Sequence, residues 1–270
     1  MTKPKVIFFG NGPLADYALD SLKDSCDIIF HAREKSDLET VKTLKSKDPS
    51  IHGVLASFGV MIKNDVLNLF EPEGILNIHP SLLPKYRGAS PIETAILNGD
   101  KTFGVSVMKL VLAMDAGPIY YQTNFSESDI FEQKIDSVSC ADYKSSIYRH
   151  LANTGASWIS SHLESLPSPV EQSGEPTFTS KFDKSMSLLD PTTKTATELL
   201  NQIRAFSGFP KSKYTFFDLS CTVISAHIAK KDESGLFVDC YDGSRLIIDQ
   251  IQPESRKVMD AKSFMNGYKK

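Results

Sequence analysis

The sequence predicts an α/β fold with a mostly parallel sheet, followed by a small all-β domain. Over residues 1–165, short apolar runs alternate with segments of helical periodicity. This alternation is typical of strand–helix–strand units in a parallel sheet. After residue 189 the pattern changes to short strands separated by turn residues, which is typical of a small barrel. We therefore expect a first domain over 1–165, a linker over 166–189 and a β-barrel domain over 190–270.

The first domain is predicted to contain strands at 5–9, 27–30, 53–57, 75–79, 104–109 and 118–123. Helical spacing of apolar residues predicts helices at 13–22, 64–69, 91–97 and 143–163. We expect Asn64 to be the N-cap of its helix. Residues 36–39, Ser-Asp-Leu-Glu, are expected to cap a short helix after the second strand.

Residues 166–189 are rich in Pro, Gly and Ser, which is typical of turns and linkers. A helix is predicted at 195–206, followed by strands at 214–219, 222–227, 236–240 and 246–251. Asp242-Gly243 is expected to form a tight turn between two of these strands.

Composition indicates a globular protein, with 41% hydrophobic and 23% charged residues. No apolar run is long enough to span a membrane and no signal-peptide pattern is present, so we expect a cytoplasmic protein. The net charge of −3 argues against a chain that coats nucleic acid indiscriminately. Residues 190–270 nevertheless carry more basic than acidic side chains, which permits contact with phosphates.

The four cysteines lack a metal-binding spacing and are expected to be buried or neutral thiols; they are Cys26, Cys140, Cys221 and Cys240.

Three polar residues form the most informative pattern in the chain. Asn77 and His79 lie two residues apart in the predicted strand 75–79, so both side chains leave the same face. Asp115 follows later, in Met-Asp-Ala-Gly. An amide and an imidazole can donate hydrogen bonds to a developing oxyanion, and a carboxylate favours the charged form of a neighbouring imidazole. Each residue alone has an ordinary structural interpretation, but together they indicate an acyl-transfer site.

These residues resemble the folate-dependent formyltransferases, which carry Asn-x-His-x-Ser-Leu-Leu-Pro and a distant Asp in an Asp-x-Gly context. The resemblance continues through residues 86–92 and 104–108. Residues 202–206 and 252–259 look like the C-terminal domain of methionyl-tRNA formyltransferases, so nearly the whole chain is covered. The resemblance implies a Rossmann-like formyltransferase domain joined to an OB-like β-barrel.

The resemblance also implies the reaction. The formyl group of 10-formyltetrahydrofolate passes to the α-amine of initiator methionyl-tRNA, giving the N-formylated form used in translation initiation. Asn77 and a protonated His79 are expected to stabilise the oxyanion. Asp115 is expected to keep His79 charged and to help move a proton. No metal is required, and the enzyme is expected to be a monomer.

Further residues receive binding roles from the same resemblance. The folate-contacting loop corresponds to Ser81, Leu82, Leu83 and Pro84, and the pterin pocket to Phe58, Met61 and Ile62. Ordinary core packing is an equal alternative for each of the latter three. On the acceptor side the candidates are Gly10, Asn11, Gly12, Lys85 and Arg87, and a solvated surface pair is the alternative for Lys85 and Arg87.

The identity of the acceptor stays open at this point. Only residues 32–51 separate the second and third predicted strands, which leaves no room for the basic insertion that methionyl-tRNA formyltransferases use to enter the tRNA acceptor end. Pro80 also stands where the tRNA enzymes commonly have Gly. The main alternative is a sugar-nucleotide N-formyltransferase with the same folate donor. A glycinamide ribonucleotide transferase, a formyltetrahydrofolate hydrolase and a non-catalytic tRNA-binding module are further alternatives.

If the acceptor is tRNA, four lysines of the C-terminal domain are expected to approach phosphates: Lys211, Lys213, Lys230 and Lys231.

Overall fold

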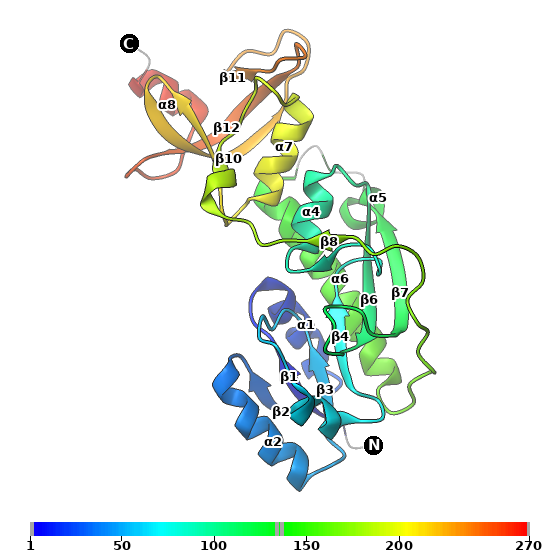
Figure 1. Cartoon of the computed structure of the whole chain (residues 1–270). Helices are drawn as coiled ribbons and strands as arrows, with labels where there is room; N and C mark the ends of the chain where they lie inside the picture. The colour runs from blue at the N-terminus through cyan, green and yellow to red at the C-terminus, as the bar shows by residue number, and fades with distance from the viewer. Residues whose placement is uncertain (1–2, 133–134, 136–137, 269–270) are drawn as a thin grey trace. The chain divides into compact units, whose positions relative to one another are not determined.

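The computed structural model describes residues 3–132, 135 and 138–268, and the chain divides into two compact units (Figure 1). Unit 1 comprises Met1–Pro91, Thr102–Ser126 and Ile147–Ser180. Unit 2 comprises Ile92–Lys101, Glu127–Ser146 and Lys181–Lys270. The segments Ile92–Lys101 and Glu127–Ser146 therefore group with the C-terminal third of the chain, although they precede it in sequence. The domain limits 1–165, 166–189 and 190–270 stay a prediction.

Unit 1 contains a six-stranded mixed sheet with the strand order β2-β1-β3-β4-β6-β7. The pairs along β2-β1-β3-β4 are parallel, and β4-β6-β7 are antiparallel. The bounds are β1 Lys5–Phe9, β2 Asp27–Ala32, β3 His52–Leu55, β4 Ile75–His79, β6 Thr102–Lys109 and β7 Ile119–Ser126. The structure thus confirms the predicted α/β class with a mostly parallel sheet, and every predicted strand of this sheet is present.

The parallel register places three strand ends at one edge of this sheet. Phe9, the last residue of β1, is level with Leu55, the last residue of β3. Leu55 is in turn level with Asn77, two residues before the end of β4. Ligands of open α/β sheets bind at this carboxyl edge, so the segments that follow these strands are the first place to look for a site.

The α-helices of the first two thirds of the chain are α1 Pro13–Lys23, α2 Leu38–Lys47, α3 Asn64–Leu67, α4 Pro91–Leu97, α5 Glu127–Phe131 and α6 Cys140–His162. Two short 3-10 helices, η1 Lys35–Asp37 and η2 Asn68–Phe70, flank α2 and α3. Within the described residues, none of the helices is long and apolar enough to cross a membrane.

Both predicted N-caps of unit 1 are wrong. Asn64 is the first residue of α3, and Lys63 occupies the cap position without a side-chain hydrogen bond. The capping box before α2 spans Glu34 and Asp37, three residues apart, instead of residues 36–39. The carboxylate of Asp37 accepts hydrogen bonds from the backbone N–H groups of Arg33 and Glu34, at 2.7 and 3.0 Å. The 3-10 helix η1 therefore precedes α2 directly.

Residues 170–180, which we call the strap, fall within the predicted linker but belong to unit 1. Val170 and Ile119 exchange backbone hydrogen bonds of 2.7 and 2.8 Å. Near its other end the strap forms β8 (Phe178–Thr179), which pairs in parallel with β5 (Arg87–Gly88). The strap is thus attached to β7 and to β5, the strand that follows residues 81–84.

Unit 2 contains an antiparallel sheet in the order β11-β12-β10-β9, with β13 paired to β12. The bounds are β9 Ser212–Phe216, β10 Leu219–Ile228, β11 Leu236–Asp239, β12 Arg245–Pro253 and β13 Met259–Asp260, with helices α7 Ala196–Ala205 and α8 Ala261–Tyr268 and the 3-10 helix η4 Lys184–Ser187. Thr195 caps α7 in a capping box with Glu198. Apolar side chains of α7, β10, β12 and α8 form a common core. The sheet is an antiparallel half-barrel, as expected for the all-β part.

The predicted strand 214–219 is wrong at its end. Phe217 and Asp218 have φ of 50° and 60°, so the chain reverses there and β10 begins at Leu219. The sequence pattern did not predict this turn, because the turn lies in a run of apolar residues and contains neither Gly nor Asn. The turn at Gly243, by contrast, lies between β11 and β12 as predicted, with φ of 82° and a backbone hydrogen bond of 3.0 Å to Cys240.

All four cysteines are buried free thiols, as predicted. Burial raises the pKa of each thiol, so they are neutral core residues.

Candidate active site

The last strand of the parallel part of the sheet, β4, carries Asn77 and His79. Each side chain is only 5% exposed. Because successive residues of a strand point to opposite faces, Asn77 and His79 share a face that Ile78 does not. His79 is the last residue of β4 and is level with Ser106 in the neighbouring β6. The sequence therefore brings both polar groups to the carboxyl edge of the sheet.

The imidazole of His79 is fixed from two sides. Its Nε2 lies 3.0 Å from the carbonyl oxygen of Tyr86. A carbonyl can only accept, so Nε2 carries a hydrogen and donates it. The other ring nitrogen, Nδ1, faces Oδ2 of Asp115 at 3.7 Å, which is longer than a hydrogen bond. In the neutral ring this nitrogen keeps its lone pair.

Asp115 is held by the segment that follows residues 81–84. Its Oδ2 accepts a hydrogen bond of 2.8 Å from the backbone N–H of Gly88 in β5. Its backbone has φ of 48°, a left-handed conformation that L-residues seldom adopt. The structure therefore brings Asn77, His79 and Asp115 to one place, although Asp115 is far from the others in sequence.

The burial of His79 acts against the positive charge that the resemblance implies for it. Burial lowers the pKa of His79 from 6.5, because an imidazolium loses its hydration there. The charge of Asp115 and the carbonyl of Tyr86 act in the opposite direction, and the nearby charge of Arg87 lowers the pKa further. The net shift is downward. This downward shift acts against a protonated His79 in the resting protein, because burial outweighs the carboxylate at 3.7 Å, and the charge of His79 stays a prediction.

Residues 81–84 are anchored by a buried hydroxyl. Ser106, which is 0% exposed, donates a hydrogen bond of 2.6 Å to the carbonyl of Ser81 and accepts one of 3.2 Å from the N–H of Leu83. Gln122 donates to the Ser106 hydroxyl and to the carbonyl of Leu83, both at 2.9 Å. Ser81 also donates from its own hydroxyl to the carbonyl of Lys85 at 2.6 Å.

Leu82 and Pro84 complete this loop. A Cβ atom at Gly104 would lie 2.3 Å from Cγ of Leu82, so the leucine packs directly on the backbone of β6. The carbonyl of Pro84 accepts a hydrogen bond of 3.2 Å from the N–H of Thr177 in the strap. The proposed folate-contacting loop is thus held by contacts with β6, β7 and the strap.

The three candidates for a pterin pocket divide into two groups. Phe58 and Ile62 are 3% and 4% exposed and belong to the core around β1, where Phe58 meets Phe9 edge-on. Met61 is 73% exposed. Of the three, Met61 has the side chain that can reach a ligand without rearrangement.

The turn after β1 carries Gly10, Asn11 and Gly12. A Cβ atom at Gly10 would lie 2.0 Å from the carbonyl oxygen of Ala56, so close packing by itself requires glycine there. Asn11 donates from its side chain to the carbonyl of Arg33 at 3.0 Å. Gly12, with φ of 83°, precedes the first residue of α1. These residues lie at the same sheet edge as His79, and nothing beyond this placement assigns them to an acceptor.

Lys85 and Arg87 lie directly after the loop. Lys85 is exposed, whereas Arg87 is half-buried. The guanidinium of Arg87 donates from Nε and Nη2 to Oε1 of Gln172, at 3.2 and 2.6 Å. Sequence reasoning missed Gln172, because a glutamine in a stretch rich in Pro, Gly and Ser has no periodicity or spacing that distinguishes it.

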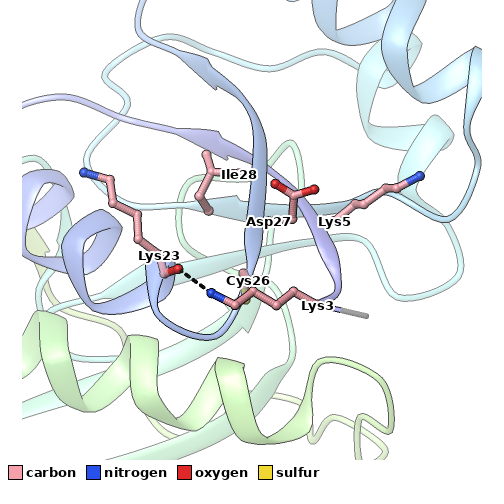
Figure 2. Close-up of a pocket in the computed structure, with 6 residues that line it drawn as sticks. All are labelled: Lys3, Lys5, Lys23, Cys26, Asp27 and Ile28. Carbon is pink, nitrogen blue, oxygen red and sulfur yellow. Dashed lines mark hydrogen bonds between the residues drawn. The ribbon is translucent and has the colours of Figure 1, made fainter. Parts of the chain in front are cut away.

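A pocket at the opposite edge of the sheet does not have the groups of an acyl-transfer site (Figure 2). It is lined by Lys3, Lys5, Lys23, Cys26, Asp27 and Ile28. Lys5 is level with Asp27 at the start of β1 and β2, so this pocket lies at the amino ends of the strands. Lys3 donates to the carbonyl of Lys23 at 3.2 Å, and Lys5 pairs with Asp48 at 2.7 Å. Among the described residues, no group of His, Cys, Asp and Glu side chains is arranged to hold a metal ion.

Comparisons with known proteins agree with this geometry. The family model described as "Formyl transferase" matches residues 7–139, and "Formyl transferase, C-terminal domain" matches residues 181–269. The methionyl-tRNA formyltransferase of Borreliella afzelii is 34% identical over 226 residues, which cover 78% of this chain and 69% of the relative.

Three solved structures share the fold. The structure of HypX from Aquifex aeolicus in complex with tetrahydrofolic acid has a TM-score of 0.70 and 13% identity, over 100% of this chain and 48% of HypX. The present chain therefore spans about half the length of HypX. Methionyl-tRNA formyltransferase from Clostridium thermocellum has a TM-score of 0.64 and 16% identity, over 96% and 100%.

The third is WlaRD, a sugar 3N-formyl transferase in the presence of dTDP and 5-N-formyl-THF, with a TM-score of 0.63 and 18% identity, over 95% of this chain and 100% of WlaRD. The two family models together cover most of the sequence, including the strand that carries Asn77 and His79 and the turn that carries Asp115. The chain therefore belongs to the formyltransferase family.

Proposed function

We propose that this formyltransferase moves the formyl group of 10-formyltetrahydrofolate to the α-amine of methionyl-tRNA. The observation that supports the chemistry is the buried pair Asn77 and His79 at the carboxyl edge of the sheet, with the carboxylate of Asp115 3.7 Å from the imidazole. A donor amide, a proton carrier and a charge to stabilise it are what formyl transfer to an amine requires. The bound folate in the HypX and WlaRD structures supports the donor class.

The first step of the proposed reaction forms a tetrahedral intermediate. The neutral acceptor amine attacks the formyl carbon, the new C–N bond forms, and the π electrons of the carbonyl move to its oxygen. The side-chain amide of Asn77 donates a hydrogen bond to that oxyanion. In comparable enzymes one such donor contributes about 3–4 kcal/mol of transition-state stabilisation.

The second step moves one proton. Because burial lowers the pKa of His79, we infer that the ring is neutral at rest and that its Nδ1 lone pair takes up the proton that the attacking nitrogen loses. The carboxylate of Asp115 then faces an imidazolium, and the attraction offsets the cost of a buried charge. When the bond from the formyl carbon to N10 breaks, the same proton passes to N10. Tetrahydrofolate and the formylated amine leave, and His79 returns to its neutral state.

Methionyl-tRNA is our first choice of acceptor because the 34% identical relative is a methionyl-tRNA formyltransferase and because residues 190–270 carry more basic than acidic side chains. A sugar-nucleotide N-formyltransferase is the second candidate. Between β2 and β3 the chain forms only η1 and α2, so no basic loop extends from this part of the molecule. The shared fold with WlaRD agrees equally well with that alternative.

An acceptor screen with the full chain tests both proposals. The purified protein is incubated with 10-formyltetrahydrofolate and with either methionyl-tRNA or dTDP-linked amino sugars, and the formylated product is quantified. We expect turnover with methionyl-tRNA and none in a folded His79→Ala control. Turnover with an amino-sugar nucleotide alone would replace the first acceptor by the second. No formyl transfer to either acceptor would contradict the proposal as a whole.

A further inference from the structure

Gln172, in the strap, uses every hydrogen-bonding group of its side-chain amide. Nε2 donates to the carbonyl of Asp115 and to the carbonyl of Gly117, both at 2.8 Å. Oε1 accepts two hydrogen bonds from the guanidinium of Arg87, at 3.2 and 2.6 Å. A primary amide has two N–H donors and one oxygen with two lone pairs, so the pattern is complete.

The contacts of Gln172 close a ring around Asp115. The carboxylate of Asp115 accepts from the N–H of Gly88, the residue after Arg87. Arg87 contacts Gln172 through its guanidinium, and Gln172 contacts the backbone of Asp115. The turn that carries the carboxylate is therefore tied to β5 twice, once through its own side chain and once through Gln172.

The strap places Gln172 at this position by contacts on both sides of it. Val170 is paired with Ile119 at the start of β7. Thr177 donates to the carbonyl of Pro84 and accepts from the N–H groups of Tyr86 and Arg87, at 3.2, 2.8 and 2.8 Å. The residues between these two contacts, which include Gln172, thus run from β7 to the segment that follows residues 81–84.

We propose that Gln172 is a positioning residue that fixes the carboxylate of Asp115 and the guanidinium of Arg87 relative to His79. The inference rests on the proposed function, because it assigns the ring a purpose in formyl transfer. The backbone of Asp115 has φ of 48°, so the turn is not the preferred local conformation and needs outside support. The two carbonyls bound by Nε2 lie on this turn and supply that support.

Loss of Gln172 is expected to change the environment of His79 in two ways. The charges of Asp115 and Arg87 act on the imidazole with opposite signs, the first raising and the second lowering its pKa. If either group moves, the proton affinity of His79 changes and the pH dependence of turnover changes with it. A glutamine with a merely structural role would alter the stability and leave the pH dependence of the folded enzyme as it was.

The experiment compares Gln172→Leu, Gln172→Glu and the neighbouring control Glu171→Gln, all in the full chain. Leucine removes all four hydrogen bonds, and a carboxylate keeps the two from Arg87 but cannot donate to the two carbonyls. We expect kcat to fall about 10- to 100-fold in both variants, as for a small displacement of a catalytic group, with the KM for folate nearly unchanged. In the pH profile of kcat, the limb that belongs to His79 should shift. The exposed Glu171 should be replaceable without effect.

A second measurement does not depend on turnover. Hydrogen exchange of the Gly88 amide, followed by NMR, should be faster in Gln172→Leu because its hydrogen bond to Asp115 is no longer fixed. If the wild-type protein formylates no acceptor, the proposed function fails while this measurement still tests the positioning role. An unchanged kcat, pH limb and Gly88 exchange in folded Gln172→Leu would overturn the inference. If the leucine variant does not fold, the same measurements on Gln172→Glu decide.

Discussion

The carboxylate of Asp115 lies 3.7 Å from the nearest imidazole nitrogen of His79, while its hydrogen bond goes to the backbone of Gly88. The pair is therefore close but not hydrogen-bonded in the resting site. Burial lowers the pKa of the imidazole, and the carboxylate lies near enough to stabilise a positive charge on the ring during the reaction. Such a site suits a histidine that takes up a proton during the reaction better than one that is charged beforehand.

The first prediction concerns Asp115→Asn. This change removes the charge that raises the pKa of His79 and leaves burial, which lowers it. The pKa of His79 should fall further, so the limb of the pH profile of kcat that belongs to this residue should move to lower pH. The maximal kcat should also fall, because the imidazolium loses its partner. Rates at saturating acceptor across pH measure both effects, and an unchanged profile would mean that Asp115 serves the fold alone.

The second prediction concerns the oxyanion. Asn77→Ala removes a buried amide from β4, and we expect kcat to fall about 10²- to 10³-fold, as for the loss of one oxyanion donor. The KM for folate should change little if the hydrogen bond forms only in the transition state. Steady-state kinetics on a protein with native circular dichroism measure this. Asn68→Ala, at an exposed asparagine of η2, is the matched control. Near-normal kcat in folded Asn77→Ala would remove the proposed role.

The third prediction concerns the support of residues 81–84. Ser106→Ala leaves the N–H of Leu83 and the carbonyl of Ser81 without the hydroxyl they now contact. An unpaired buried polar group costs about 1–3 kcal/mol, so the loop should loosen and the KM for 10-formyltetrahydrofolate should rise. Titration of folate binding measures the loss of affinity, and a thermal melt measures the loss of stability. Ser187→Ala removes another buried hydroxyl, in unit 2, and should leave folate binding unchanged.

The periodicity of apolar residues predicted the strands and helices, and it also predicted which side chains share a face of a strand. The bounds of β1, β4 and α4 match the predicted ones, and Asn77 and His79 share a face because strand periodicity requires it. The nearness of Asp115 came from the resemblance to a family, not from spacing. The turn at residues 217–218 was missed because its two positive-φ residues are Phe and Asp.

Two features of the site depend on contacts between distant segments, which a sequence pattern does not contain. The lowered pKa of His79 follows from its burial in the folded chain. Gln172 lies in a stretch of linker composition, yet it contacts Arg87 and Asp115 across 85 and 57 residues. Composition predicted a linker at 166–189, but it does not reveal what such a segment packs against.

The fourth prediction concerns the stability of unit 2. His227 in β10 lies 2.9 Å from Asp249 in β12 and 2.9 Å from Glu233 in the following loop. Burial alone would lower the pKa of His227, but the two carboxylates raise it above 6.5. The stabilisation is therefore fully present below pH 6.5 and is lost as pH rises through the raised pKa.

His227→Gln should thus reduce the free energy of unfolding more at acidic than at alkaline pH. Urea unfolding at several pH values measures the difference. His52→Gln gives the opposite trend, because burial lowers the pKa of His52 and its neutral form stabilises the fold above pH 6.5. Equal effects of His227→Gln at all pH values would show that the imidazole is not charged in the folded protein.

The last prediction tests whether unit 2 contacts tRNA. Deleting residues 190–270 is a poor test, because Cys140, which precedes the deleted segment, belongs to the core formed with α7 and β10. Replacing charge leaves that core intact, and four exposed lysines are candidates: Lys211, Lys213, Lys230 and Lys231. Each phosphate contact contributes about 0.7–0.9 to the slope of log affinity against log salt. The variant with all four lysines changed to Gln should therefore bind methionyl-tRNA more weakly and with a shallower slope, while the KM for folate stays constant.

A variant with Lys23→Gln and Lys47→Gln in unit 1 is the control. If the fourfold variant keeps both the affinity and the slope, these lysines do not contact tRNA, and the amino-sugar nucleotide becomes the favoured acceptor.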